Sequence, residues 1–236
     1  MSDGLYYNKL QRFYSRNGVK FRTARPAYRG EIFHHDRILT DKFHFCLEVL
    51  PLLRSNYPVL WADETSINAW LQPKKVFMDM REPFRVPLPS KRHSQITLFG
   101  AVGNCLARSC FYIGKKTTIN EFSNFAASLK DCLLPLTVRP VLILDNHRAH
   151  KNPQLLRSLE QDFLIMFQPA YSPQLNSQEW MWAMVKPAIR RRLLELSIAG
   201  EFERDDMLRV VTETLAGVSV QVSRNVGKCC VPNIKL

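Results

Sequence analysis

The sequence lacks the features that mark exported and membrane-spanning proteins. Its 236 residues contain no run of 18 apolar residues, the length that a membrane-spanning helix requires. The first residues, MSDGLYYNKLQRFYSRNG, lack the apolar segment of a secretory signal peptide. We therefore expect a soluble intracellular protein with no membrane partner. Its location would be the nucleus in a eukaryote, or the cytoplasm and nucleoid in a bacterium.

No two cysteines have the CxxC spacing typical of zinc sites, although the chain has six cysteines. Cys229 and Cys230 are adjacent, which fits poorly with either a zinc site or a simple disulfide framework. We interpret the cysteines as buried free thiols in a reducing compartment. The chain also shows no internal repeat and no low-complexity segment, and its length suits one full-sized domain with a small appendage.

Acidic residues are scarce relative to basic ones. The chain has 33 Lys and Arg against 21 Asp and Glu, a formal net charge of +12. This excess favours a polyanionic partner, because each Lys or Arg paired with a phosphate releases condensed counterions. Ribosomal and membrane-surface proteins share such basicity, so the charge narrows the class of protein without choosing one. Apolar residues make up 46% of the chain, enough for a sizeable core.

The pattern of apolar residues predicts helices first and a mixed α/β arrangement afterwards. Before Pro58 we expect helices over residues 3–16 and 37–54, joined through a basic linker, Lys20–Arg29. After Pro58 the expected strands are Val59–Ala62, Val76–Met80, Ser94–Val102, Ser109–Ile113, Val141–Leu144 and Phe163–Phe167. The expected helices are 118–133 with Thr118 as N-cap, Pro153–Glu160, one starting near Ser177, and Asp205–Leu215.

This order of elements predicts the fold class. Antiparallel strands followed by parallel strands with crossover helices imply an α/β fold, a mixed sheet with helices on both faces. The same layout characterises the ribonuclease H-like fold. The tail after the last predicted helix gives no clear pattern.

Two acidic residues directly follow apolar strands: Asp63 follows VLWA, and Asp145 follows VLIL. Ligands of open α/β sheets bind beyond the carboxyl ends of the strands, so we expect both side chains at one edge if the strands are parallel neighbours. Carboxylates that close repel each other unless a cation lies between them, and oxygen ligands suit Mg²⁺ or Mn²⁺. Glu179, on the helix near Ser177, would complete a two-metal site for phosphoryl displacement.

A simpler interpretation exists for each of these acids taken alone. An Asp after a strand often forms a turn or caps the next helix, and a Glu in a first helical turn often complements the helix dipole. The local sequences around the three acids therefore decide between the two interpretations.

Three sequence blocks surround these acids: WADET at 61–65, LDNHRAHK at 144–151 and YSPQLNSQEW at 171–180. They resemble the signature blocks of mariner-superfamily DDE transposases and their bacterial insertion-sequence relatives. The 34-residue separation of Asp145 and Glu179 is also close to what that family uses. Gln174 and Ser177 stand where the family usually has Asp and Pro, so we expect a less rigid loop there.

The resemblance implies a function and a domain organisation. It implies that Asp63, Asp145 and Glu179 hold two Mg²⁺ or Mn²⁺ ions, which cut transposon ends and join the 3′-hydroxyl to target DNA at TA sites. The partners would be double-stranded DNA and a second copy in a synaptic homodimer. Residues 1–30 would be a remnant of the N-terminal DNA-binding region and a basic linker, and 31–236 the catalytic domain, with its core at 58–195. A domesticated, non-catalytic DNA-binding protein and another ribonuclease H-like nuclease are the alternatives.

Several further residues are expected to support the site or bind DNA. We expect Asn146 and His150 to steady the metal-bound carboxylates, and leave His147 undecided. Lys91 and Arg92 are interpreted as part of a DNA-facing basic rim. Glu179, Ala183, Lys186 and Arg190 share one helix face, which would hold phosphates or be simply solvated, and Pro187 is expected to disturb that helix. The opposite face is expected to pack in the core through Trp182, Val185, Ile189 and Leu193.

Overall fold

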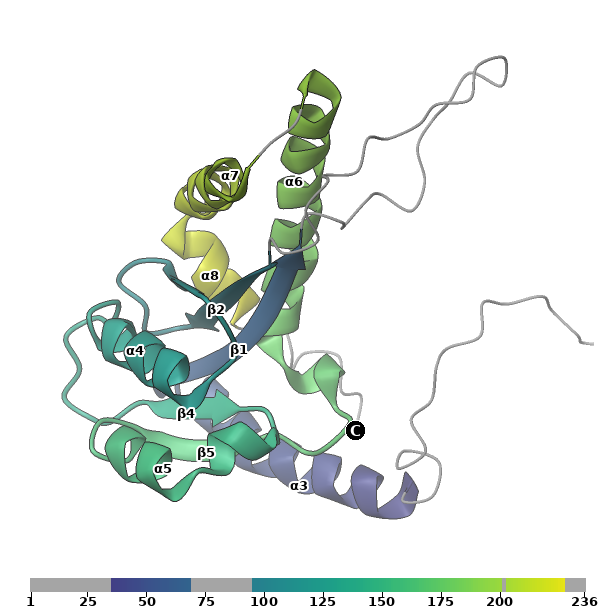
Figure 1. The fold of residues 1–236 in the computed structure, drawn as a ribbon. Coiled ribbons are helices and arrows are strands. Elements are labelled where there is room, and N and C mark those ends of the chain that lie inside the picture. The colour runs from purple at the N-terminus through teal and green to yellow at the C-terminus, as the bar shows by residue number, and fades with distance from the viewer. Residues whose placement is uncertain (1–34, 69–94, 201–202, 228–236) are drawn as a thin grey trace, which may run out of the picture. The chain divides into compact units, whose positions relative to one another are not determined.

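A computed structural model describes residues 35–68, 95–200 and 203–227 (Figure 1). From Asp36 onwards these residues belong to one compact unit. The predicted helix at 3–16, the linker Lys20–Arg29, the strand Val76–Met80, and the basic residues Lys91 and Arg92 lie outside the described residues. In the described part of the chain, no helix is both long enough and apolar enough to cross a bilayer.

The described residues form a five-stranded mixed sheet with the strand order β3-β2-β1-β4-β5 (Figure 1). The antiparallel half consists of β1, β2 and β3, and the parallel half of β1, β4 and β5. The strand bounds are Val59–Asn68, Gln95–Gly103, Cys110–Gly114, Val141–Leu144 and Leu164–Phe167, from β1 to β5. The predicted fold class is therefore confirmed.

Strand β1 is longer than the sequence pattern predicts. We expected it to end at Ala62, with Asp63 following it, but it continues to Asn68. The reason is that β1 has two different neighbours: its parallel pairing with β4 ends at Trp61, whereas its antiparallel pairing with β2 runs on to Asn68. Asp63 therefore lies in the part of β1 that is paired with β2 only.

The described helices are close to the predicted ones, with one addition. Thr118 caps its helix as expected, since its side chain accepts a hydrogen bond from the backbone N–H of Glu121. The helix near Ser177 runs without a break through Pro187. The short last helix, α8, was not predicted. The helices are α3 (His35–Arg54), α4 (Ile119–Lys130), α5 (Pro153–Leu159), α6 (Ser177–Ala199), α7 (Arg204–Ala216) and α8 (Val220–Val226), with 3₁₀ turns η1 (Arg148–Lys151) and η2 (Pro173–Leu175).

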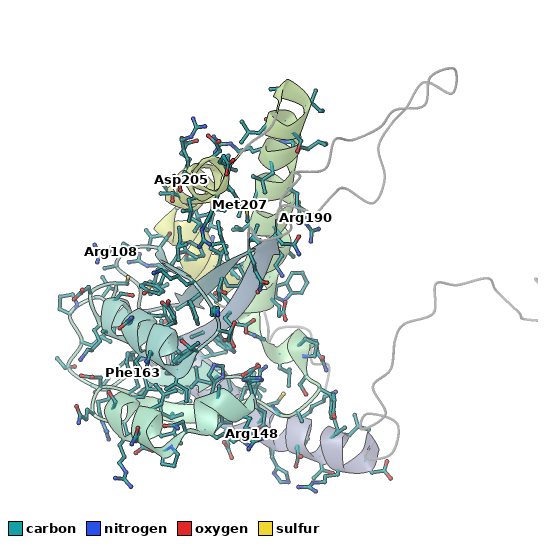
Figure 2. The ribbon with its side chains drawn as sticks, in the orientation of Figure 1. Arg108, Arg148, Phe163, Arg190, Asp205 and Met207 are labelled. Atoms are coloured by element: carbon teal, nitrogen blue, oxygen red, sulfur yellow. The ribbon has the colours of Figure 1, made fainter. Side chains whose placement is uncertain are left out.

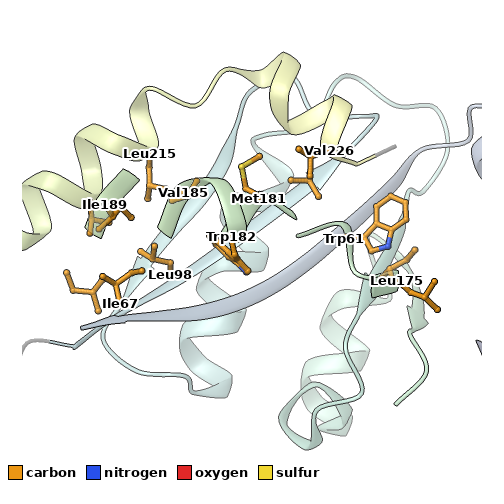
Figure 3. Close-up of a cluster of buried hydrophobic side chains, with 14 of the residues drawn as sticks. Trp61, Ile67, Leu98, Leu175, Met181, Trp182, Val185, Ile189, Leu215 and Val226 are labelled. Carbon is orange, nitrogen blue, oxygen red and sulfur yellow. The ribbon is translucent and has the colours of Figure 1, made fainter. Parts of the chain in front are cut away.

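The sheet has an apolar core on each face. Side chains of one face, here called the α6 face, pack with α3, α6, α7 and α8; Trp61 and Trp182 are among them (Figure 3). Side chains of the other face, the α4 face, pack with α4 and α5; Leu60 and Phe99 belong to this cluster. Because successive residues of a strand point to opposite faces, Asp63 lies on the α6 face and Glu64 on the α4 face.

The predicted core face of α6 is confirmed, because all four of its residues are buried: Trp182, Val185, Ile189 and Leu193. The described cysteines are also free and buried, as expected, namely Cys46, Cys105, Cys110 and Cys132. Burial of these thiols accounts for their use as small apolar side chains in both cores.

Candidate active site

Asp63 and Asp145 come from neighbouring parallel strands and lie at the same level of the sheet. The last register pair of β1 and β4 joins Trp61 to Ile143, and each aspartate lies two residues further along its chain. Neighbouring strands are about 4.8 Å apart, so this register places the two aspartates side by side at the carboxyl end of β4. Asp63 is buried and Asp145 is partly exposed.

Glu179 reaches this edge from the first turn of α6, and Asn176 fixes where that turn begins. Asn176 is the N-cap of α6: its side-chain oxygen accepts a hydrogen bond from the backbone N–H of Gln178. Its side-chain N–H donates to Oδ2 of Asp63 at 3.1 Å. One buried amide thus joins β1 to the helix that carries Glu179. The sequence block at 171–180 contains Asn176, but the sequence analysis assigns it no role, although Asn is a common N-cap.

The pKa of Asp63 shows that several carboxylates converge. Burial, as the largest cause, and then the negative charges of Glu179, Glu64 and Asp145, in that order, together raise this pKa from 3.8 to about 7. A hydrogen bond from the backbone N–H of Glu64 opposes the shift. Because such repulsion requires proximity, the three predicted acids share one electrostatic environment.

Asp145 is in the opposite electrostatic situation. Burial would raise its pKa, but a hydrogen bond with His150 and the backbone N–H of His147 outweigh burial and lower it. Both contacts are made to Oδ1, at 2.6 Å from His150 Nδ1 and 3.0 Å from His147 N. Within the described residues, Oδ2 of Asp145 has no hydrogen bond and remains available to a ligand.

His150 connects Asp145 with a fourth carboxylate that the sequence analysis did not single out. Its ring is almost fully buried and lies 4.6 Å from the Phe122 ring, measured between centroids. Nδ1 faces Asp145, and Nε2 lies 3.3 Å from Oε2 of Glu64. Burial would lower the pKa of His150, but these two carboxylates raise it to about 10, so the ring carries a positive charge at neutral pH.

The remaining predicted residues take different positions. Asn146 is exposed and, among the described residues, makes no hydrogen bond to the carboxylates. His147 caps η1, because its Nδ1 accepts the backbone N–H of Ala149. Lys186 and Arg190 are partly exposed on α6, and Arg190 lies on the side of that helix turned away from α7 (Figure 2).

The donor set fits a hard divalent cation, although the side chains are not in a coordinating arrangement. Within the described ranges, no three His, Cys, Asp or Glu side chains are grouped closely enough to hold a metal ion as they stand. The charges that shift the pKa of Asp63 are nevertheless all negative, so ionising this buried carboxyl costs free energy that a cation would offset. Glu179 is exposed, so its side chain is free to turn toward the two aspartates. Carboxylate oxygens are the ligands that Mg²⁺ prefers.

The fold and this cluster of carboxylates define a class of protein, and the sequence places the chain in it. The family described as DDE superfamily endonuclease matches residues 58–197, more than half of the chain. The protein therefore belongs to the DDE superfamily endonucleases. This confirms the family that the three sequence blocks indicated. No curated protein sequence matches the chain.

Solved structures of the mariner transposase Mos1 share the fold. The Mos1 paired-end complex with Mg has a TM-score of 0.63 and 15% identity, covering 94% of this chain and 70% of that one. The Mos1 strand transfer complex has a TM-score of 0.62 and 15% identity, covering 95% and 68%. The isolated Mos1 catalytic domain has a TM-score of 0.54 and 12% identity, covering 89% and 96%. The shared architecture is the ribonuclease H-like fold.

Proposed function

We propose that this protein is a DNA transposase that cuts transposon ends in a metal-dependent reaction and transfers the freed 3′-hydroxyl to target DNA. The observation that carries the proposal is the placement of Asp63 and Asp145 on neighbouring parallel strands, with Asn176 tying the start of α6, which carries Glu179, to Asp63. Membership of the DDE endonucleases supports the cleavage chemistry. The likeness to Mos1, whose structures include a strand transfer complex, supports the transfer step.

The ions would be held by Asp63, Asp145 and Glu179. Mos1 has been solved with Mg and with Mn, which supports the choice of a divalent cation here. A pair of such ions would activate the attacking hydroxyl and stabilise the leaving oxygen of an in-line displacement. Oδ2 of Asp145 has no hydrogen bond among the described residues, so it is the oxygen of that residue best suited to bind an ion.

The protein's own residues would position the metal ligands and bind the phosphates. Asn176 keeps the start of α6 against β1, so that Glu179 stays beside Asp63. Lys186 and Arg190 continue from Glu179 along α6 and would contact phosphates next to the cut. We propose the same role for Lys91 and Arg92. Double-stranded DNA with TA target sites and a synaptic homodimer complete the proposal.

The test is cleavage of DNA by a variant of one predicted ligand. Asp145→Asn should abolish nicking of supercoiled plasmid DNA in Mg²⁺ or Mn²⁺, by at least roughly a thousandfold, equivalent to about 4 kcal/mol of barrier. DNA binding, measured by fluorescence anisotropy, should be unchanged. The matched control is Asp162→Asn, because Asp162 is an exposed aspartate paired with Lys130. Nicking by Asp145→Asn at the wild-type rate would contradict the assignment.

A further inference from the structure

We propose that Glu64 is a positioning residue of the active site: acting through His150, it holds the carboxylate of Asp145 so that its second oxygen stays free to bind a metal ion. This inference rests on the proposed function and adds to it a residue that touches neither the metal nor the DNA. It is carried by the chain of contacts from Glu64 to His150 to Asp145, which links β1 to the segment after β4.

The His150 ring is held at both of its nitrogen atoms. Nδ1 lies 2.6 Å from Oδ1 of Asp145, and Nε2 lies 3.3 Å from Oε2 of Glu64. The ring is 1% exposed and packs on Phe122, so water cannot replace either contact easily. A buried ring with a carboxylate at each nitrogen has one preferred orientation, because rotating the ring would break both contacts.

Glu64 cannot join Asp63 as a ligand on the same side of the sheet. The two residues are consecutive in β1, so their side chains point to opposite faces. Asp63 contacts Asn176 of the α6 face, whereas Glu64 lies opposite Phe99, whose ring packs on Phe122 and Phe125 of α4. The connection from Glu64 to the ligands therefore passes through His150.

This connection determines which oxygen of Asp145 is free. The two hydrogen bonds from His150 and His147 both occupy Oδ1. Turning the carboxylate about its Cβ–Cγ bond would change the direction in which its free oxygen points, and the fixed His150 ring opposes that turn. Without Glu64, the ring loses one of its two anchors and Asp145 is less firmly oriented. Partners of this kind behind metal ligands change metal affinity by about 10- to 100-fold when removed.

The experiment compares Glu64→Ala with Glu64→Gln. Glu64→Ala should raise the Mn²⁺ concentration for half-maximal plasmid nicking about 10- to 100-fold, while the rate at saturating Mn²⁺ stays near that of the wild type. Glu64→Gln should give a smaller increase than Glu64→Ala, because the amide keeps a side chain beside Nε2 of His150 but removes the charge of the ion pair. The matched control is Glu121→Gln, since Glu121 also anchors neighbouring groups, Tyr112 and Lys115, but outside the site.

A double-mutant cycle separates this role from direct action. In the His150→Ala background, Glu64→Ala should have almost no further effect on the Mn²⁺ requirement, because the ring through which Glu64 acts on Asp145 is already absent. An undiminished effect in that background, or a wild-type Mn²⁺ requirement of Glu64→Ala, would overturn the inference. Thermal unfolding of each variant checks that the fold is intact.

Mn²⁺ affinity measured by calorimetry keeps the two proposals distinguishable. If the wild type binds Mn²⁺ in a Glu64-dependent manner but nicks no DNA, the positioning role stands and the transposase proposal fails. If the wild type nicks DNA but its Mn²⁺ affinity does not depend on Glu64, the transposase proposal stands and the positioning role fails. A wild type that neither binds Mn²⁺ nor nicks DNA overturns both.

Discussion

The two aspartates of the site sit side by side on neighbouring strands, yet the protein treats their charges in opposite ways. Asp63, on the α6 face, is buried among carboxylates, and its pKa rises to about 7. Asp145 has His150 as a positively charged neighbour, and its pKa falls below the usual value. The comparison shows that the surroundings of each aspartate, and not its residue type, set its pKa.

The physical difference lies in the partner that each aspartate receives. Asn176 gives Asp63 a neutral amide, which orients the carboxylate without compensating its charge. His150 both orients and compensates Asp145. In the proposed function, Asp63 is therefore the residue whose charge the cation would stabilise, whereas the charge of Asp145 is already compensated by His150. The following predictions test this contrast.

The largest expected effect is a gain of stability from Asp63→Asn. Because the folded-state pKa of Asp63 lies above 3.8, ionisation of this carboxyl costs stability as pH rises from about 4, and the cost is complete above about 7. Without metal, the variant should be more stable than the wild type at pH 8 by up to about 4 kcal/mol. The gain should shrink at pH 5. Urea unfolding of the wild type and of Asp63→Asn, with a chelator present, measures the difference in stability at pH 8 and at pH 5.

The matched variant Asp145→Asn should change stability in the other direction. The folded-state pKa of Asp145 is lowered, so its stabilisation is present above the unfolded pKa and is lost as pH falls through the folded one. Removing this charge leaves the buried His150 ring without its closest partner. If both Asn variants gained stability at pH 8, the contrast between the two aspartates would be wrong.

The second effect is stabilisation by the metal. Mg²⁺ at about a hundred times its dissociation constant should stabilise the wild type by about 2.7 kcal/mol. The stabilisation should be greater at pH 8 than at pH 6, because below pH 7 protons compete with the ion for Asp63. Thermal melting with and without Mg²⁺ at the two pH values measures this. An equal increase in melting temperature with Mg²⁺ at pH 6 and at pH 8 would mean that Asp63 does not bind the ion.

The smallest expected effect concerns Asn176. Asn176→Ala removes the N-cap of α6 together with the hydrogen bond to Asp63, and should cost about 0.5–2 kcal/mol of stability. The nicking rate should fall more than this loss suggests, since Glu179 is no longer fixed beside Asp63. Asn176→Asp separates the two roles: it keeps a capping oxygen but places another negative charge against Asp63. A wild-type nicking rate in Asn176→Ala would show that neither the cap nor the hydrogen bond to Asp63 is needed to position Glu179.

Much of the fold was predictable because its signals are local. Four consecutive apolar residues before Asp145 predicted the interior strand β4, and Thr118 with Glu121 predicted the start of α4. The end of β1 was wrong for a physical reason: its last residues pair only with β2, and that antiparallel partner lies about 30 residues further along the chain. Helix α8 was missed because it is short and carries a weak pattern.

The sequence by itself determined the family and the mixed sheet and singled out the three acids as candidates, because these depend on residue types in fixed order within short blocks. Only the tertiary structure decided how each acid is surrounded. Glu64 follows Asp63 directly in the chain, but the pleat sends it to the opposite face, where it contacts His150. Asn176 lies 113 residues from Asp63 and meets it only when α6 packs on β1. Burial and charge at a site sum over such distant neighbours, and no local pattern encodes that sum.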